Sequence, residues 1–123
     1  MGFTLSTINL DSPDPLALAR FYGELLGWEI GVAEPDWVVL RNPSDGGVCL
    51  SFQLEAAYVR PVWPAGPGDQ QMQIHLEVQV DELAPAVDRA TSLGATLASY
   101  QPQDDVRVCL DPDGHPFCLW IET

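Results

Sequence analysis

The sequence contains no lysine, and all five of its basic residues are arginines. Against 18 acidic residues they leave a net charge of -13 at pH 7. This charge repels phosphate backbones and anionic lipids, so we expect no nucleic-acid partner and no membrane partner. The same charge keeps a protein in solution or, alternatively, attracts a cationic ligand, and the sequence leaves both interpretations open.

Long hydrophobic runs and a cysteine framework are also missing. No stretch approaches the roughly 20 apolar residues of a membrane span, and the first residues lack the basic start and apolar middle of a signal peptide. We therefore expect a cytoplasmic protein. The cysteines are Cys49, Cys109 and Cys118, an odd number without metal-finger spacing and each inside an apolar run, which favours reduced thiols over disulfides.

The sequence contains an internal repeat. Residues 42–52 align without a gap on residues 111–121, and the alignment matches Cys49 with Cys118. Each copy begins with Pro, Asp and Gly residues that are typical of a turn, and an apolar run typical of a strand follows. A chain of 123 residues, 46% of them hydrophobic, is long enough for one compact domain, so we predict a single domain made of a duplicated module.

The hydrophobic pattern predicts the order βαβββ twice, hence an α+β fold. Module one covers residues 3–54, a linker rich in Pro and Gly covers 55–70, and module two covers 71–122. The predicted elements are strand 3–10, helix 15–26, and strands 28–32, 37–41 and 48–54, then strand 71–80, a helix before Gly94, and strands 96–100, 106–110 and 116–122. Asp14 and Asp81 are the predicted N-caps, and Gly27 is predicted to end the first helix.

The two faces of the predicted strands differ in polarity. One face is wholly apolar, and we assign it to the side under the helices; it carries Ile8, Leu10, Leu50, Phe52, Leu54, Ile74, Leu76, Val78, Leu119 and Ile121. The opposite face carries Thr7, Asn9, Cys49, Ser51, Gln53, Gln73, His75, Glu77, Cys118, Trp120 and Glu122.

The polar side chains of this second face, with Trp and His among them, predict a concave small-molecule pocket. Trp63 of the linker is predicted to pack over its mouth. A solvated sheet face would look similar, and Trp63 has a plain packing role as its alternative. Against the solvated face, Cys49, Cys118 and Trp120 are poor choices for a surface open to water.

His75 and Glu77, two residues apart on a strand, point to the same side and are the candidate catalytic pair for acid/base chemistry. A single histidine on a sheet face is, alternatively, a hydrogen-bonded structural residue. His115 in the final turn is interpreted as a turn residue.

Several motifs together resemble the vicinal oxygen chelate superfamily, which includes glyoxalase I, extradiol dioxygenases and bleomycin-resistance proteins. They are the paired modules, the first helix at residues 18–28, His75-Leu76-Glu77-Val78, and the closing run at residues 111–117. The resemblance covers nearly the whole chain and is closest to small glyoxalase-like members. It implies a curved eight-stranded mixed sheet with two helices on its convex face.

In metal-dependent members of that superfamily the ligands come from the first and last strands of each module. The resemblance places them here at Thr7, Cys49, His75 and Cys118, and of these only His75 has the side chain found in the family's enzymes. We therefore expect no metal cofactor, and poor binding of oxygen-loving divalent ions. Zinc is the exception, with His75, Cys49 and Cys118 as its ligand set.

These observations favour a glyoxalase-like binding protein with a degenerate metal site, holding a small, partly aromatic or cationic ligand in the concave face. The alternative is a lyase or dioxygenase that uses His75 with Glu77 or an atypical metal set. A purely structural module is a third interpretation. The resemblance also implies a homodimer, as in similar small members.

Overall fold

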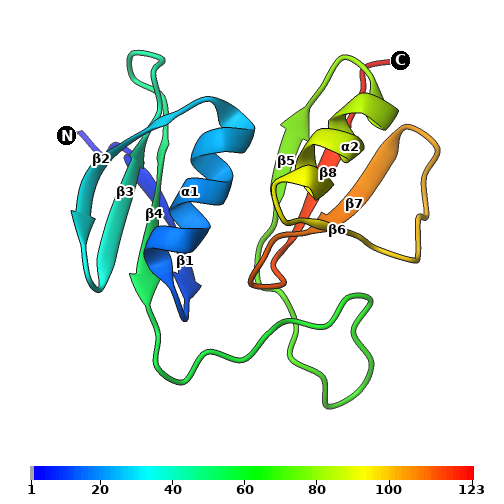
Figure 1. Ribbon diagram of the computed structural model, residues 1–123, viewed down its shortest axis with the longest axis horizontal. Helices are drawn as coiled ribbons and strands as arrows, with labels where there is room; N and C mark the ends of the chain where they lie inside the picture. The colour runs from blue at the N-terminus through cyan, green and yellow to red at the C-terminus, as the bar shows by residue number, and fades with distance from the viewer. Residues whose placement is uncertain (1) are drawn as a thin grey trace. The chain divides into compact units, whose positions relative to one another are not determined.

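The order of elements is βαβββ in each half of the chain (Figure 1), in a computed structural model that describes residues 2–123. Two compact units make up the chain, one ending at Tyr58 and the other running from Val59 to Thr123. The elements are β1 (Thr7–Ser12), α1 (Pro15–Leu26), β2 (Glu29–Glu34), β3 (Trp37–Arg41) and β4 (Cys49–Leu54), then β5 (Leu76–Gln79), α2 (Leu83–Ser92), β6 (Thr96–Leu97), β7 (Val106–Leu110) and β8 (Pro116–Trp120). The predicted α+β fold of two βαβββ modules is confirmed, with the eight strands hydrogen-bonded as two four-stranded mixed sheets. That the two units form one domain stays a prediction.

The first unit is a sheet of order β1-β4-β3-β2 with α1 against one face (Figure 1). The parallel pair β1 and β4 places Leu10 beside Phe52 on the face under the helix. Tyr22 of α1 is fully buried and stacks on Phe52, with ring centroids 5.9 Å apart. This apolar layer stabilises the unit by removing large side chains from water.

The second unit repeats the arrangement with order β5-β8-β7-β6 and α2 in contact with β6, β7 and β8. The register pairs Leu76 with Phe117 and Glu77 with Cys118. Because paired residues of neighbouring strands share a face, Phe117 and Leu119 lie on one side of the sheet, and Cys118 and Trp120 lie on the other. Both are buried; this confirms the predicted place of Leu119 on the apolar face and adds Phe117 to it.

Some predicted bounds were wrong. The first strand was predicted to begin at residue 3, but it begins at Thr7, and Phe3 and Leu5 are exposed. The fifth strand was predicted over 71–80, but it covers only Leu76–Gln79; the register places His75 opposite Pro116, a residue without an N–H group, and regular pairing stops there. Two members of the predicted apolar face, Leu54 and Ile74, are exposed.

The two helix caps had different outcomes. Asp14 accepts a hydrogen bond from the Ala17 amide, and Gly27 ends α1 in the left-handed conformation at φ 72°, both as predicted. Asp81 is not the N-cap of α2; Glu82 takes that position, without a side-chain hydrogen bond. Neither of the two helices in residues 2–123 is long and apolar enough to cross a membrane.

Candidate functional site

A cavity of about 380 Å³ lies within the second unit, at the face of the sheet opposite α2. Its lining residues come from the linker, from the segment around β5, from the loop before β7, and from β7 and β8: Trp63, Met72, His75, Glu77, Pro102, Gln103, Val106, Val108, Pro116 and Cys118. The wall is mostly apolar, with the polar groups gathered around His75 and Glu77. This volume and mixture are typical of small-molecule sites.

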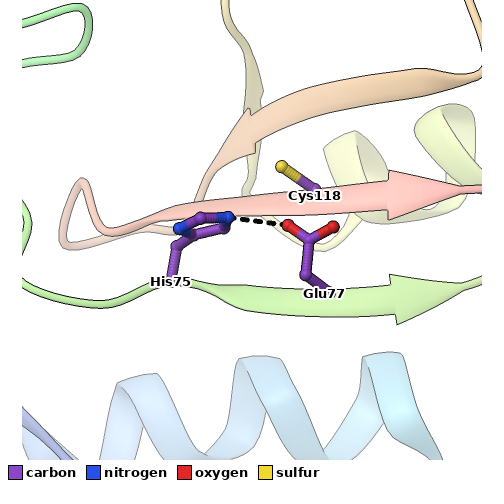
Figure 2. A group of neighbouring side chains, drawn as sticks. All are labelled: His75, Glu77 and Cys118. Atoms are coloured by element: carbon purple, nitrogen blue, oxygen red, sulfur yellow. Dashed lines mark ion pairs between the residues drawn. The ribbon is translucent and has the colours of Figure 1, made fainter.

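The polar group of the cavity is built on two adjacent strands (Figure 2). His75 directly precedes β5, Glu77 lies within β5, and Cys118 is the register partner of Glu77 on β8. The Nε2 atom of His75 lies 2.7 Å from Oε2 of Glu77, with the two side chains 38% and 50% exposed. The Cys118 thiol donates a hydrogen bond to the same carboxylate. Glu77 is therefore the centre of the group, with a neighbour on either side.

The ionisation of Cys118 is strongly disfavoured in this setting. Burial, together with the smaller effects of the hydrogen bond to Glu77 and of its negative charge, raises the pKa of the Cys118 thiol to about 12. In the absence of a bound cation, Cys118 is thus a neutral thiol at neutral pH and not a nucleophile.

Trp63 forms one wall of the cavity from the linker. Its ring packs against the buried cluster of Ala98, Val108 and Cys118, and its centroid lies 5.7 Å from that of Tyr100. Nearby, Arg60 donates from Nη1 to the Pro112 carbonyl at 2.9 Å, which ties the linker to the turn before β8. Trp63 therefore packs against the unit and also lines the cavity, and its role in holding a ligand stays a prediction.

The remaining predicted pocket residues lie elsewhere. Trp120 is half-buried on the same face of the second sheet but does not line this cavity. The others, Thr7, Asn9, Cys49, Ser51 and Gln53, lie on β1 and β4 of the first unit, where register pairs Thr7 with Cys49 and Asn9 with Ser51. Ser51 donates from Oγ to Oδ1 of Asn9 at 2.9 Å, so these two polar groups satisfy each other.

Sequence reasoning missed six lining residues: Met72, Pro102, Gln103, Val106, Val108 and Pro116. Val106 and Val108 could have been found, because they alternate along the predicted strand 106–110; the structure pairs them with Trp120 and Cys118. Pro102 and Gln103 lie in a loop whose path no periodicity reveals. Met72 lies in residues 71–75, which were predicted as part of a strand but are not one, so strand alternation could not place it.

The donor atoms of this group determine which metal it fits. One ligand atom each from His75, Glu77 and Cys118 lie within 4.8 Å of one another. Imidazole, carboxylate and thiolate are zinc ligands, whereas magnesium and calcium take oxygen. The three residues fit zinc, for which they would supply two anionic ligands and one neutral ligand. A bound zinc ion would act as a Lewis acid toward a ligand in the cavity.

Two sequence comparisons bear on the family of this chain. A family profile described as a glyoxalase-like domain matches residues 7–120. A search of curated protein sequences finds no match.

Similar solved structures span the full chain. A glyoxalase/bleomycin resistance protein/dioxygenase family enzyme from Burkholderia phytofirmans PsJN is 20% identical, with 97% of this chain and 98% of that chain covered and a TM-score of 0.72. A glyoxalase-related enzyme from Fulvimarina pelagi is 24% identical, with coverages of 97% and 88% and a TM-score of 0.69. The oxidase ChaP-H2 is 18% identical, with coverages of 100% and 96% and a TM-score of 0.64. At these identities the likeness establishes the fold.

Proposed function

Because the chain belongs to the glyoxalase-like family of the vicinal oxygen chelate superfamily, whose fold serves both enzymes and binders, we propose that it binds a small organic molecule without transforming it. The observation that supports this proposal is the cavity of about 380 Å³ in the second unit, with apolar walls and one polar cluster. The four positions at which the resemblance places metal ligands carry Thr7, Cys49, His75 and Cys118, so one hydroxyl and two thiols stand where the superfamily's enzymes usually have His, Gln or Glu.

We propose that the ligand is partly aromatic and carries a positive charge. Trp63 offers an aromatic wall, and the face of an indole ring attracts cations by about 0.5–2 kcal/mol. Glu77 presents a half-exposed carboxylate to the same cavity. The net charge of -13 raises the local concentration of cations around the whole molecule.

Matched ligands test both features. Phenethylamine and 3-phenylpropionate share a ring and differ in the sign of their charge, and cyclohexylethylamine keeps the charge without the aromatic ring. Titration into ¹⁵N-labelled protein should shift the indole N–H signal of Trp63 with the amine and not with the acid. Equal shifts with the acid would contradict the charge preference, and an equally tight cyclohexyl amine would contradict the aromatic preference.

Two variants have matched controls in the same unit. Trp63→Ala should weaken phenethylamine binding by about 1 kcal/mol or more, roughly fivefold or more, while Trp120→Ala, outside the cavity lining, should leave affinity unchanged. Glu77→Gln should weaken the amine more than Glu122→Gln does, although both remove one charge and Glu122 is exposed. Equal losses in either pair would show that binding occurs outside the cavity.

Catalysis is the second candidate, and the 2.7 Å contact between His75 and Glu77 favours it. A histidine oriented by a carboxylate at a cavity wall is suited to move a proton to or from a bound molecule. Turnover of an α-keto aldehyde hemithioacetal or of a catechol, with a pH-rate profile that disappears in His75→Ala, would establish this function and overturn binding alone.

We further propose that the protein acts in the cytoplasm as a homodimer. Cys49, Cys109 and Cys118 are all free, which suits a reducing compartment. Small members of the superfamily pair their chains, and the dimer is tested at the level of the whole molecule below.

A further inference from the structure

We propose that His75, Glu77 and Cys118 form a zinc site that is complete within the second unit, with Glu77 as a ligand. The superfamily pattern draws ligands from both modules and does not use the position of Glu77. A one-module site of this composition is therefore a departure from that pattern, and it needs neither Thr7 nor Cys49.

The backbone brings the three donors together before any ion arrives. Glu77 and Cys118 are register partners on parallel strands, so their side chains leave the same face at neighbouring points (Figure 2). His75 lies two residues before Glu77, and its Nε2 atom already contacts the carboxylate. In a tetrahedral zinc site, bonds of about 2.0–2.3 Å place any two ligand atoms roughly 3.3–3.8 Å apart. The donors already lie within 4.8 Å of one another, so side-chain adjustment alone would let them meet an ion.

The chemistry of the donors selects among metals. A thiolate and a carboxylate together balance the two positive charges of zinc, and a neutral imidazole completes the three protein ligands typical of zinc sites that keep an open position. The same trio lies at the wall of the cavity, which leaves that position accessible to a small molecule. Magnesium and manganese, which prefer oxygen ligands, should bind poorly.

This inference does not rest on the proposed binding of a cationic molecule, and the two bear on each other through Glu77. A zinc ion and an amine would both require its carboxylate. Zinc should therefore weaken phenethylamine binding by about tenfold or more if both proposals hold. Zinc binding without any amine binding would support the metal site and contradict the cationic ligand.

Cobalt(II) is the probe for the site, because a thiolate ligand gives it an intense charge-transfer absorption in the near ultraviolet. Protein purified without chelator and then titrated with cobalt should develop this band to one equivalent, and one equivalent of zinc should abolish it. Elemental analysis after gel filtration should then find zinc in a one-to-one ratio. Absence of the band, or zinc lost on gel filtration from wild-type protein, would overturn the proposal.

Variants identify the ligands. Cys118→Ser should remove the charge-transfer band, while Cys49→Ser, the same change on the first unit, should leave it intact. Because Cys118 is buried, circular dichroism must show that its variant is folded, and Glu77→Gln at a half-exposed position gives a second test. Glu77→Gln and His75→Ala should weaken zinc at least as much as the roughly 10- to 100-fold cost of removing a supporting hydrogen-bond partner in known metal sites. Loss of the band in Cys49→Ser, or unchanged affinity in Glu77→Gln, would overturn the one-unit site.

Discussion

At the residue scale, burial changes the acidity of two thiols, those of Cys109 and Cys118. The sequence alone gives no sign of this change. Both thiols lie on neighbouring strands, Cys109 at full burial on the helix side of the second sheet and Cys118 on the cavity side. Burial raises the pKa of Cys109 to about 11 and contributes most to the higher pKa of Cys118. The prediction of reduced thiols is consistent with all three cysteines being free.

The raised pKa of Cys109 predicts a loss of stability in alkaline solution. Below the ordinary thiol pKa of 9.0 both folded and unfolded chains keep the proton, so the stabilisation is complete. Between pH 9 and about 11 only the unfolded chain releases it, and the free energy of unfolding falls by about 1.4 kcal/mol per pH unit for this thiol. Urea unfolding across this range should therefore give a shallower slope for Cys109→Ala than for wild type.

Cys49→Ala is the control for this measurement, because Cys49 is only partly buried. It also removes a thiol, and Cys109→Ala should give a shallower alkaline slope than this control as well. The absolute stability of Cys109→Ala will fall because a buried side chain is shortened, so the comparison concerns the slope alone. Parallel slopes for wild type and Cys109→Ala would contradict the prediction.

At the scale of elements, the turn between β7 and β8 depends on Gly114. Its φ of 90° lies where side chains are rarely found, and a Cβ there would collide with the side chain of Arg60. Gly114→Ala should therefore destabilise the protein by more than about 1 kcal/mol, measured as a shift in denaturation midpoint. The Asp111 carboxylate, which accepts hydrogen bonds from the amides of Asp113 and His115, holds the rest of this turn.

A double-mutant cycle separates the two causes. In an Arg60→Ala background the collision is gone and the unfavourable φ remains, so Gly114→Ala should cost less than in wild type but still a measurable amount. An identical cost in both backgrounds would show that the linker contact plays no part. Gly2→Ala, at a position with open space around it, is the neutral control.

The ends of a helix or strand could be predicted where residues next to them in the sequence determine them, and not where a partner strand does. The helix predicted at about residues 15–26 is confirmed because Asp14, Pro15 and Gly27 determine its ends through a local hydrogen bond and backbone preference. Strand 71–80 was overextended because alternation alone does not reveal where the partner strand begins, and β8 begins at Pro116. The role of Glu77 beside Cys118 was missed for the same reason, since it follows from register and not from spacing in the chain.

The loop at residues 98–105 marks the limit of sequence reasoning about the site. Its Gln101 side chain makes three hydrogen bonds to the backbone of Ala98 and Val108, which fixes the segment that brings Pro102 and Gln103 to the cavity. A single glutamine in a polar stretch gives no sign of such contacts. The candidate pair His75 and Glu77 could be predicted, whereas most of the wall around it could not.

At the scale of the whole molecule, we predict a homodimer. The first unit has an edge strand, β2, with exposed Ile30, and nearby Trp28 is only partly covered. Edge strands with apolar side chains are common sites of chain pairing. Sedimentation equilibrium at micromolar concentration should give twice the mass of the 13.5 kDa chain, and Ile30→Asp should shift the equilibrium toward the monomer. A single 13.5 kDa species for wild type would contradict this prediction.

The linker has a consequence for how the chain can be cut. Between Leu54 and Leu76 no residue belongs to a helix or strand, and such exposed segments are where proteases act first. Trypsin has no favourable site there, because the sole basic residue, Arg60, precedes Pro61 and there is no lysine. A glutamate-specific protease has one at the exposed Glu55–Ala56 bond. Limited proteolysis with that enzyme would divide the chain at the boundary between its halves and deliver the entire cavity on one fragment.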